Sequence, residues 1–272
     1  MIAIIAVSSI LALLYFIATT DTQNDSRTTN QVDYSKPLFQ ILLSEEETSH
    51  IKIVEGSIVL GSGALALKPE LMNLYRDVGL LDTNQNVVVV YPTFTETAYS
   101  ENGFYSYYKQ LCDSSCLTVD IKRDFAGKYH VGQVSFMALT LLNYPFITDI
   151  DIDQNPSILD NYDKVILLHN EYVTRTEFDA ITKHPHVIYL YPNALYAEIK
   201  TDYNNTITLI RGHGYPDQNI TNGFDWSYDN TKFEYDEKCD NWYFYEIGNG
   251  KMLSCYPEQR ILYDKIDRKS VV

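Results

Sequence analysis

The stretch Lys164-Val-Ile-Leu-Leu-His169 is the clearest strand signal in the sequence. Its continuous apolar run is typical of a strand that is buried on both faces of a sheet. A helix is predicted directly after it, from Thr174 to Thr182, because Thr174 is a favourable N-cap and Glu177 occupies the capping-box position. Together the two elements predict one strand–helix unit of an α/β fold.

The same alternation of strand and helix signals continues on both sides of this unit. Apolar strands separated by helices predict a mostly parallel sheet flanked by helices. In such sheets the functional site lies beyond the carboxyl ends of the strands. We expect further strands at residues 87–91, 117–121, 146–150, 186–191 and 206–210, and a further helix at 134–142.

Beyond Gly212 the pattern changes to short aromatic segments with Asp, Asn and Gly. Residues 242–247 and 251–256 predict a β-hairpin around Gly248-Asn249-Gly250. This hairpin belongs to an aromatic-rich β extension over residues 213–260, which is either an addition to the sheet edge or a lid. We therefore expect a single α/β domain over residues 38–272 that ends in this extension.

The N-terminal segment indicates the compartment. Residues 1–20 are almost wholly apolar and uncharged, and about 20 helical residues span a bilayer core. An uncleaved signal anchor is favoured over a cleaved signal peptide or a buried core helix, because no Lys or Arg precedes the apolar run. Residues 21–37 are polar and predict a flexible linker. We expect a single-pass protein of the cell membrane with an extracytoplasmic C-terminal domain, secreted if the segment is cleaved.

The cysteines and sequons agree with export. Local closure favours disulfides Cys112–Cys116 and Cys239–Cys255 over the two other pairings, and a zinc site is the competing interpretation. Sequons are also present, although such triplets are common by chance. The candidate glycosylation sites are Asn24, Asn204 and Asn219.

Composition excludes several classes of protein. The chain has 36 acidic and 21 basic side chains and a formal net charge of −15, which argues against a nucleic-acid partner. Its 45% hydrophobic residues argue against a disordered chain. We found no nucleophile elbow, phosphate-binding loop or dinucleotide fingerprint, so hydrolysis by an ordinary triad is not expected.

Two groups of polar residues could carry chemistry. His169-Asn-Glu171 follows the strongest strand, where an imidazole and a carboxylate can face one cleft; the alternative is a polar strand end that caps the next helix. Asp149, Asp151 and Asp153 alternate as in a strand, but Gln and Asp replace the Gly and Glu that a calcium loop requires. The remaining histidines have no ligand-like spacing, and we interpret them as structural: His130, His184, His186 and His213.

Several segments between residues 85 and 200 resemble the large subunit of N,N-dimethylformamidase and its relatives. The clearest are residues 146–156 and 159–174, which include the family's His-x-Glu-Tyr at His169 to Tyr172. Residues 186–196 are similar to the family's strand followed by Gly-Asn-x-x-Tyr, here with Asn193 and Tyr196. Weaker similarity covers Ala98-Tyr99 with Asn102-Gly103 and Tyr105, and residues 119–125.

The resemblance implies a class I glutamine-amidotransferase-like (flavodoxin-like) α/β domain and hydrolysis of a small amide. It implies one iron ion, with Glu171 and Tyr99 as ligands and His169 as the acid/base. Hard oxygen ligands suit Fe(III), which can polarise a carbonyl and activate water. Asn193, Tyr172 and Tyr196 would lie at the same site. The family's second tyrosine ligand aligns with Phe125, which has no oxygen, and Tyr129 would replace it only if the loop bends.

Two functions follow from these residues. The first is a membrane-anchored, extracytoplasmic, metal-dependent hydrolase of amide C–N bonds. The second is a catalytically degenerate domain of the same fold that acts as a cell-surface or envelope binding module with protein partners. The intact His169-x-Glu171-Tyr172 favours the first, and Phe125 with the added aromatic hairpin favours the second.

Overall fold

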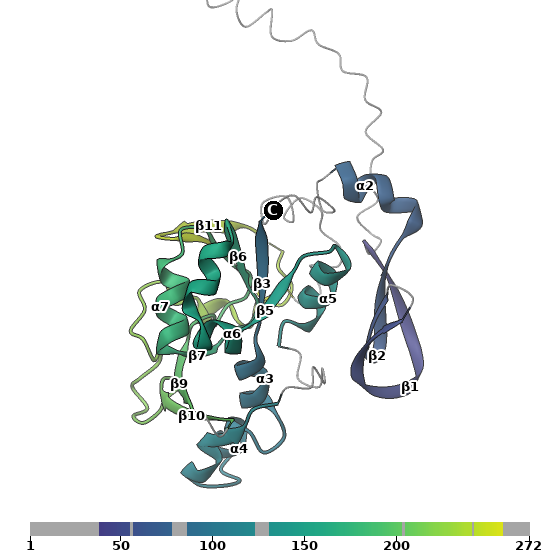
Figure 1. The fold of residues 1–272 in the computed structure, drawn as a ribbon. Coiled ribbons are helices and arrows are strands. Elements are labelled where there is room, and N and C mark those ends of the chain that lie inside the picture. Colours follow the sequence, from purple (N-terminus) through teal and green to yellow (C-terminus); the bar gives the residue numbers. More distant parts are fainter. Residues whose placement is uncertain are drawn as a thin grey trace, which may run out of the picture. The chain divides into compact units, whose positions relative to one another are not determined.

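The structure, a computed structural model, describes residues 38–54, 57–77, 86–122, 131–202, 205–240 and 242–257. The largest sheet in this part of the chain has the strand order β11-β12-β8-β6-β3-β5 (Figure 1). Neighbouring strands from β12 to β5 are parallel, and only β11 runs antiparallel to its neighbour. Its strands are β3 (Val87–Tyr91), β5 (Phe146–Thr148), β6 (Lys164–Leu167), β8 (Val187–Tyr189), β11 (Phe244–Ile247) and β12 (Gly250–Leu253).

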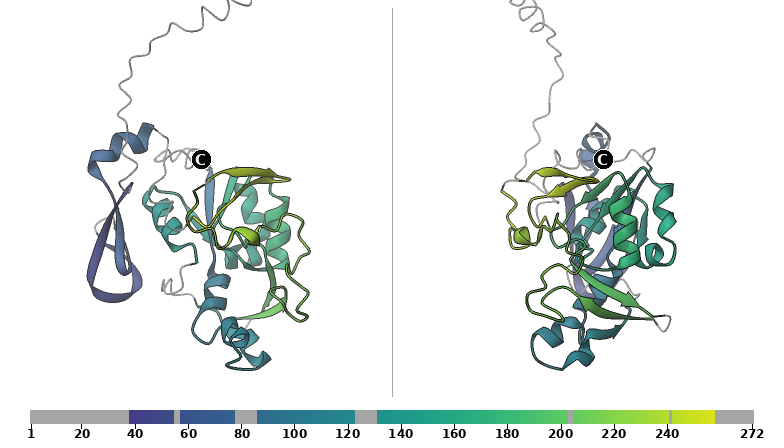
Figure 2. Two further views of the ribbon diagram at one scale, coloured as in Figure 1. Left: turned by 180° about the vertical axis from the view of Figure 1, so that it is seen from behind. Right: turned by 90° about the vertical axis from the view of Figure 1, so that its left-hand side faces the viewer.

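Helices cover both faces of this sheet, as the continuous apolar strands predicted. Successive residues of β3 alternate between two cores: Val89 packs with α5 (Gln133–Leu141), whereas Val88 packs with α6 (Asp149–Gln154) and α7 (Arg175–Lys183). Figures 1 and 2 show α5 on one side of the sheet and α6 and α7 on the other. The predicted α/β class, with mostly parallel strands flanked by helices, is therefore confirmed.

A second sheet corrects the prediction that all these strands belong to one mostly parallel sheet. The segments expected at 117–121 and 206–210 form β4 (Thr118–Asp120) and β10 (Thr206–Arg211), which pair antiparallel with each other. This sheet has the order β4-β10-β9-β7, with β7 (Tyr172–Thr174) parallel to β9 (Ala197–Thr201). Because β7 follows β6 after a short connection, the second sheet begins next to the carboxyl end of the first.

The three alternating aspartates lie in a helix, so the predicted strand at 146–150 ends early. Thr148 caps α6 by accepting a hydrogen bond from Asp151 N, and the Asp151 carboxylate accepts one from Thr148 N. A capping box thus stops the strand at Thr148 and starts the helix at Asp149. At α7 the Thr174 half of the predicted box is present, but the Glu177 carboxyl oxygens have no hydrogen-bond partner.

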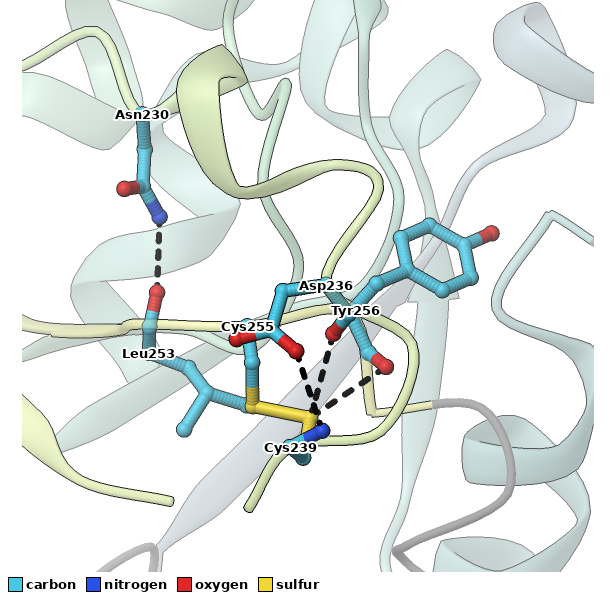
Figure 3. The surroundings of a disulfide bond; sticks show 6 residues. All are labelled: Asn230, Asp236, Cys239, Leu253, Cys255 and Tyr256. Carbon is cyan, nitrogen blue, oxygen red and sulfur yellow. Dashed lines mark hydrogen bonds between the residues drawn. A yellow bond between two sulfur atoms is a disulfide. The ribbon is translucent and has the colours of Figure 1, made fainter. Parts of the chain in front are cut away.

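The C-terminal hairpin extends the sheet edge. Strands β11 and β12 pair antiparallel, and β12 also pairs with β8. The predicted disulfides Cys112–Cys116 and Cys239–Cys255 are both present. Figure 3 shows how the second one ties the segment before β11 to the end of β12, beside the Asn230 amide that donates to Leu253 O at 2.7 Å. The hairpin is therefore an addition to the edge of the sheet rather than a lid. Tyr256 follows directly after its second strand.

The remaining elements precede or connect these sheets. The described N-terminal part is an antiparallel pair, β1 (Phe39–Val54) and β2 (Ser57–Leu67), followed by α2 (Met72–Asp77). Two short helices follow β3, namely α3 (Thr93–Tyr99) and α4 (Phe104–Tyr108). The 3-10 helices are η1 (Pro69–Leu71), η2 (Ser114–Leu117), η3 (Pro156–Asn161) and η4 (Thr231–Phe233).

Some predictions fall on other residues. The signal anchor (1–20), the linker (21–37), Asn24, Phe125, Tyr129, His130 and Asn204 lie outside the described residues. Among the residues that are described, no helix is both long and apolar enough to cross a membrane.

Candidate functional site

Glu171 lies in the connection between β6 and β7, and its backbone is held from two sides. Glu171 N and Tyr172 N donate to Thr95 Oγ1 of α3 at 2.9 and 3.1 Å. Glu171 O accepts from Tyr196 N and Ala197 N at 3.0 and 2.9 Å. The position of this carboxylate is therefore set by the helix after β3 and by the segment that leads into β9.

The Glu171 side chain is buried against a phenol and an imidazole. Tyr99, the last residue of α3, donates its hydroxyl to Glu171 Oε2 at 2.7 Å. His169 Nε2 lies 3.5 Å from the same oxygen, and the His169 and Glu171 side chains are 4% and 1% exposed. The structure thus brings together the three residues for which the sequence predicted a shared role.

Tyr105 extends this cluster from the next helix. Its hydroxyl donates to Tyr99 OH at 2.9 Å, and the two rings lie 4.5 Å apart. The tight turn between α3 and α4 requires Gly103, since a Cβ atom there would lie 2.4 Å from Ala98 O. A residue without a side chain at this turn allows the two phenols to converge.

His213 closes the cluster from the loop after β10. Its Nε2 atom is 3.1 Å from Tyr105 OH and 3.9 Å from Glu171 Oε1. Since Tyr105 gives its proton to Tyr99, we assign Nε2–H of His213 as the donor to Tyr105. The hydrogen bonds therefore run in one direction. His213 donates to Tyr105, Tyr105 donates to Tyr99, and Tyr99 donates to the Glu171 carboxylate.

Burial and the Glu171 charge keep these phenols protonated. Burial, and next the negative charge of Glu171, raise the pKa of Tyr99, of Tyr105 and of Tyr172 above the usual value. The same causes in the same order raise the pKa of Tyr108. At neutral pH these tyrosines are therefore neutral, and two of them, Tyr99 and Tyr105, act as hydrogen-bond donors in the series that ends on Glu171.

Buried polar atoms without hydrogen bonds gather on the same strand ends. In the described part of the chain, His169 Nε2, both amide atoms of Asn170 and Asn193 Oδ1 have no hydrogen-bond partner. Leaving such groups unpaired costs about 1–3 kcal/mol each, so those of His169 and Asn170, the residues directly before Glu171, are available to a polar ligand. His169 Nδ1 faces Tyr256 OH at 3.4 Å, a long contact from the edge of the hairpin.

The turn after β8 holds the other two predicted site residues. Asn193 has a φ of 67°, is 5% exposed, and donates through Nδ2 to Glu234 Oε2 at 2.6 Å. Asn is one of the few residues that adopt this left-handed conformation readily. The Tyr196 ring lies 5.8 Å from the His213 ring. Burial raises the pKa of Tyr196 to about 12. Tyr196 therefore borders the cluster beside His213, whereas Asn193 is bound to Glu234.

Oxygen donors are the feature of this site that suits a metal. Over the described ranges, no group of three or more His, Cys, Asp or Glu side chains is arranged to hold a metal ion. Three oxygen donors nevertheless lie together, because Tyr99 OH is within hydrogen-bond distance of both Tyr105 OH and the Glu171 carboxylate. Two histidines, His169 and His213, also approach this carboxylate. As one carboxylate and two phenolates, these donors carry three negative charges, which suits a trivalent cation with a preference for hard oxygen ligands.

Sequence reasoning missed part of the cluster. His213 was interpreted as structural, yet its ring faces Tyr105 and Glu171. Tyr105 was noted in the family resemblance but had no role, and Tyr256 and Glu234 were not singled out. The signal at Tyr105 was the preceding Gly103, whereas His213 is brought in by the second sheet and had no local signal. His184 instead makes contacts typical of a structural residue, with Nε2 2.9 Å from Tyr162 O.

Other predicted sites are at the surface. Asn219 is exposed, and its Nδ2 atom donates to Asp217 Oδ1 at 2.8 Å. The residues around Cys112 and Cys116 are exposed as well. Comparison of the chain with protein-family models and with curated protein sequences finds no match.

Proposed function

We propose that this chain is a metal-dependent hydrolase of small amides, related to the large subunit of N,N-dimethylformamidase. The observation that carries the proposal is the hydrogen bond of 2.7 Å between Tyr99 OH and the buried Glu171 carboxylate, next to His169. These are the residues that the resemblance assigns to metal binding and acid/base chemistry. Tyr105, with its hydroxyl 2.9 Å from that of Tyr99, would supply the second phenolate in place of Phe125.

The finer fold assignment is part of the same proposal. We assign the domain to the class I glutamine-amidotransferase-like group because a strained turn follows β8, where those enzymes carry their nucleophile. Here Asn193 occupies that turn with a φ of 67°. Since Asn is not a nucleophile, a hydrolase with this turn needs another source of activated water, as a metal centre would provide.

Different residues of the buried cluster would have different roles in amide hydrolysis. Glu171, Tyr99 and Tyr105 would hold the iron(III) ion, which when bound acts as a Lewis acid on a carbonyl and on water. His169 would accept a proton from the attacking water through Nε2 and donate it to the departing amine nitrogen. This role requires the tautomer with its proton on Nδ1, which faces Tyr256 OH at 3.4 Å.

The unpaired amide groups would position the substrate. Asn170 offers both a donor and an acceptor that are fully buried, and Asn193 offers a buried acceptor. A substrate amide has the complementary acceptor and donor, so it can satisfy groups that otherwise remain unpaired. The products would be a carboxylic acid and an amine.

We also propose an extracytoplasmic location for the domain. Two disulfides are typical of proteins that fold in an oxidising compartment, which supports an exported domain. The apolar residues 1–20 would then anchor it in the membrane.

The test is an activity assay on the full chain loaded with iron(III) and supplied with a panel of small amides. We expect release of amine, and a fall in kcat of about 100- to 10,000-fold in His169→Gln with unchanged iron content. His186→Gln is the matched control because His186 is exposed. A folded, iron-loaded protein that cleaves no amide would contradict the proposal and favour the catalytically degenerate binding module.

A further inference from the structure

Two phenol oxygens and one imidazole nitrogen form a ring with the Glu171 carboxylate. Tyr99 OH lies 2.7 Å from Glu171 Oε2, and Tyr105 OH lies 2.9 Å from Tyr99 OH. His213 Nε2 lies 3.1 Å from Tyr105 OH and returns to Glu171 Oε1 at 3.9 Å. The four residues come from four separate segments, namely α3, α4, the connection after β6 and the loop after β10.

The spacing of this ring is that of ligands around a single ion. Nitrogen and oxygen ligands lie about 2.0–2.2 Å from a first-row transition metal, so adjacent ligands are about 3 Å apart. The observed separations run from 2.7 to 3.9 Å and bracket this value. Hydrogen bonds now join three of the four neighbouring pairs, and a cation would replace the protons of those bonds.

The backbone holds His213 in this position at a conformational cost. Its φ is 55°, a left-handed value that is uncommon for residues other than Gly, Asn, Asp and His. His213 N donates to Thr221 O at 2.8 Å, and the imidazole stacks on the Tyr108 ring with centroids 4.5 Å apart. The surroundings therefore fix both the turn and the plane of the ring, as expected for a side chain with a directional partner.

We propose that His213 Nε2 is a fourth ligand of the metal centre, beside Tyr99, Tyr105 and Glu171. This inference rests on the proposed metal-dependent function. Three anionic oxygens already balance the charge of iron(III), and a neutral imidazole adds a ligand without adding charge. The centre would thus contain two phenolates, one carboxylate and one imidazole, and His169 would stay free for proton transfer.

The test is iron(III) binding by the full chain, with ferric citrate as the probe and a competing chelator to measure affinity. We expect His213→Gln to bind iron about 10- to 100-fold more weakly than the wild type and to shift the visible phenolate-to-iron absorption. His186→Gln, an exposed histidine, should bind as the wild type does. Thermal melts of the metal-free proteins show that each variant is folded.

The outcomes separate the two proposals. If His213→Gln binds iron as tightly as the wild type while Tyr99→Phe binds weakly, His213 is not a ligand and the metal centre stands without it. If the folded wild type binds no iron, the proposed function itself is wrong. If His213→Gln does not fold, pulsed electron paramagnetic resonance of iron-loaded His169→Gln with ¹⁵N-histidine decides: a directly coupled imidazole nitrogen supports the assignment, and its absence overturns it.

Discussion

Glu171 and Glu177 are both fully buried carboxyl groups, 1% and 0% exposed, yet their surroundings differ. Glu171 accepts a hydrogen bond from a phenol and faces two imidazoles. The Glu177 oxygens have no hydrogen-bond partner, and burial, followed by the charges of Asp149 and Asp153, raises the Glu177 pKa well above its usual value. One carboxyl is thus surrounded by groups that can share a cation, whereas the other is made neutral by a proton.

The comparison shows why burial of an acid does not by itself indicate a site. Asp149 provides a third case, because its buried carboxyl accepts hydrogen bonds from Phe94 N and Ile150 N at 2.8 and 2.9 Å and so caps α3. Burial raises the pKa of Asp149 well above its usual value, although these two backbone donors oppose the shift. A buried carboxyl can therefore be stabilised by backbone donors, by protonation or by side chains that are themselves potential ligands. Of these three carboxyl groups, only Glu171 is surrounded by side chains that are potential metal ligands.

The same substitution at the two glutamates gives the largest expected difference. Glu171→Gln should weaken iron(III) binding at least about 100-fold, because it removes an anionic ligand, whereas Glu177→Gln should leave the affinity unchanged. Chelator competition on both purified variants measures the effect. Equal losses in the two variants would show that the difference between the two surroundings has no bearing on metal binding.

The pH dependence of binding should distinguish the phenols from ordinary hydrogen-bond donors. Because the pKa values of Tyr99 and Tyr105 are raised, both are protonated at neutral pH, and iron must displace their protons. Affinity should therefore increase about tenfold per pH unit for each proton released. The measurement is the iron affinity between pH 6 and 8, in a buffer that keeps the ferric ion chelated. An affinity independent of pH would mean that the phenols do not become ligands.

Glu177→Gln should have a smaller effect, on stability. The folded-state pKa of Glu177 is raised above the unfolded value of about 4.3, so the folded protein holds a proton that the unfolded chain releases. The stability gained from this group is complete below the unfolded pKa and is lost as pH rises towards the folded pKa. The Gln variant lacks this loss, so its free energy of unfolding at pH 8 should be about 1–2 kcal/mol higher than that of the wild type.

Chemical denaturation at pH 5 and pH 8 checks this expectation. The matched control is Glu246→Gln, since Glu246 is 77% exposed and pairs with Lys251 at the surface. A wild-type stability that rises between these pH values, with the Gln variant parallel to it, would contradict a protonated Glu177.

The sequence predicted the parts of the fold that depend on local patterns. The continuous apolar run at residues 164–169 correctly indicated a strand buried on both faces, and the Cys spacing correctly indicated both disulfides. The strand predicted at residues 146–150 is present only as far as Thr148, because the Thr148 capping box outweighed the alternating pattern of the aspartates. The prediction also missed the second sheet, since pairing of β4 with β10 joins residues far apart in the chain.

The candidate site shows the same limit. Tyr99, His169 and Glu171 could be predicted together because a family resemblance covers them. His213 could not, because its position depends on the antiparallel pairing of β9 with β10 and on the left-handed turn that follows. Tyr256 likewise reaches His169 only because the β11–β12 hairpin joins the sheet next to β8.

The most direct test of the metal centre is the iron content of the full chain, purified after production with iron supplied. We predict about one iron per chain in the wild type and almost none in Glu171→Gln, with both proteins folded. A folded wild-type protein without bound iron, even after incubation with ferric citrate, would contradict the account.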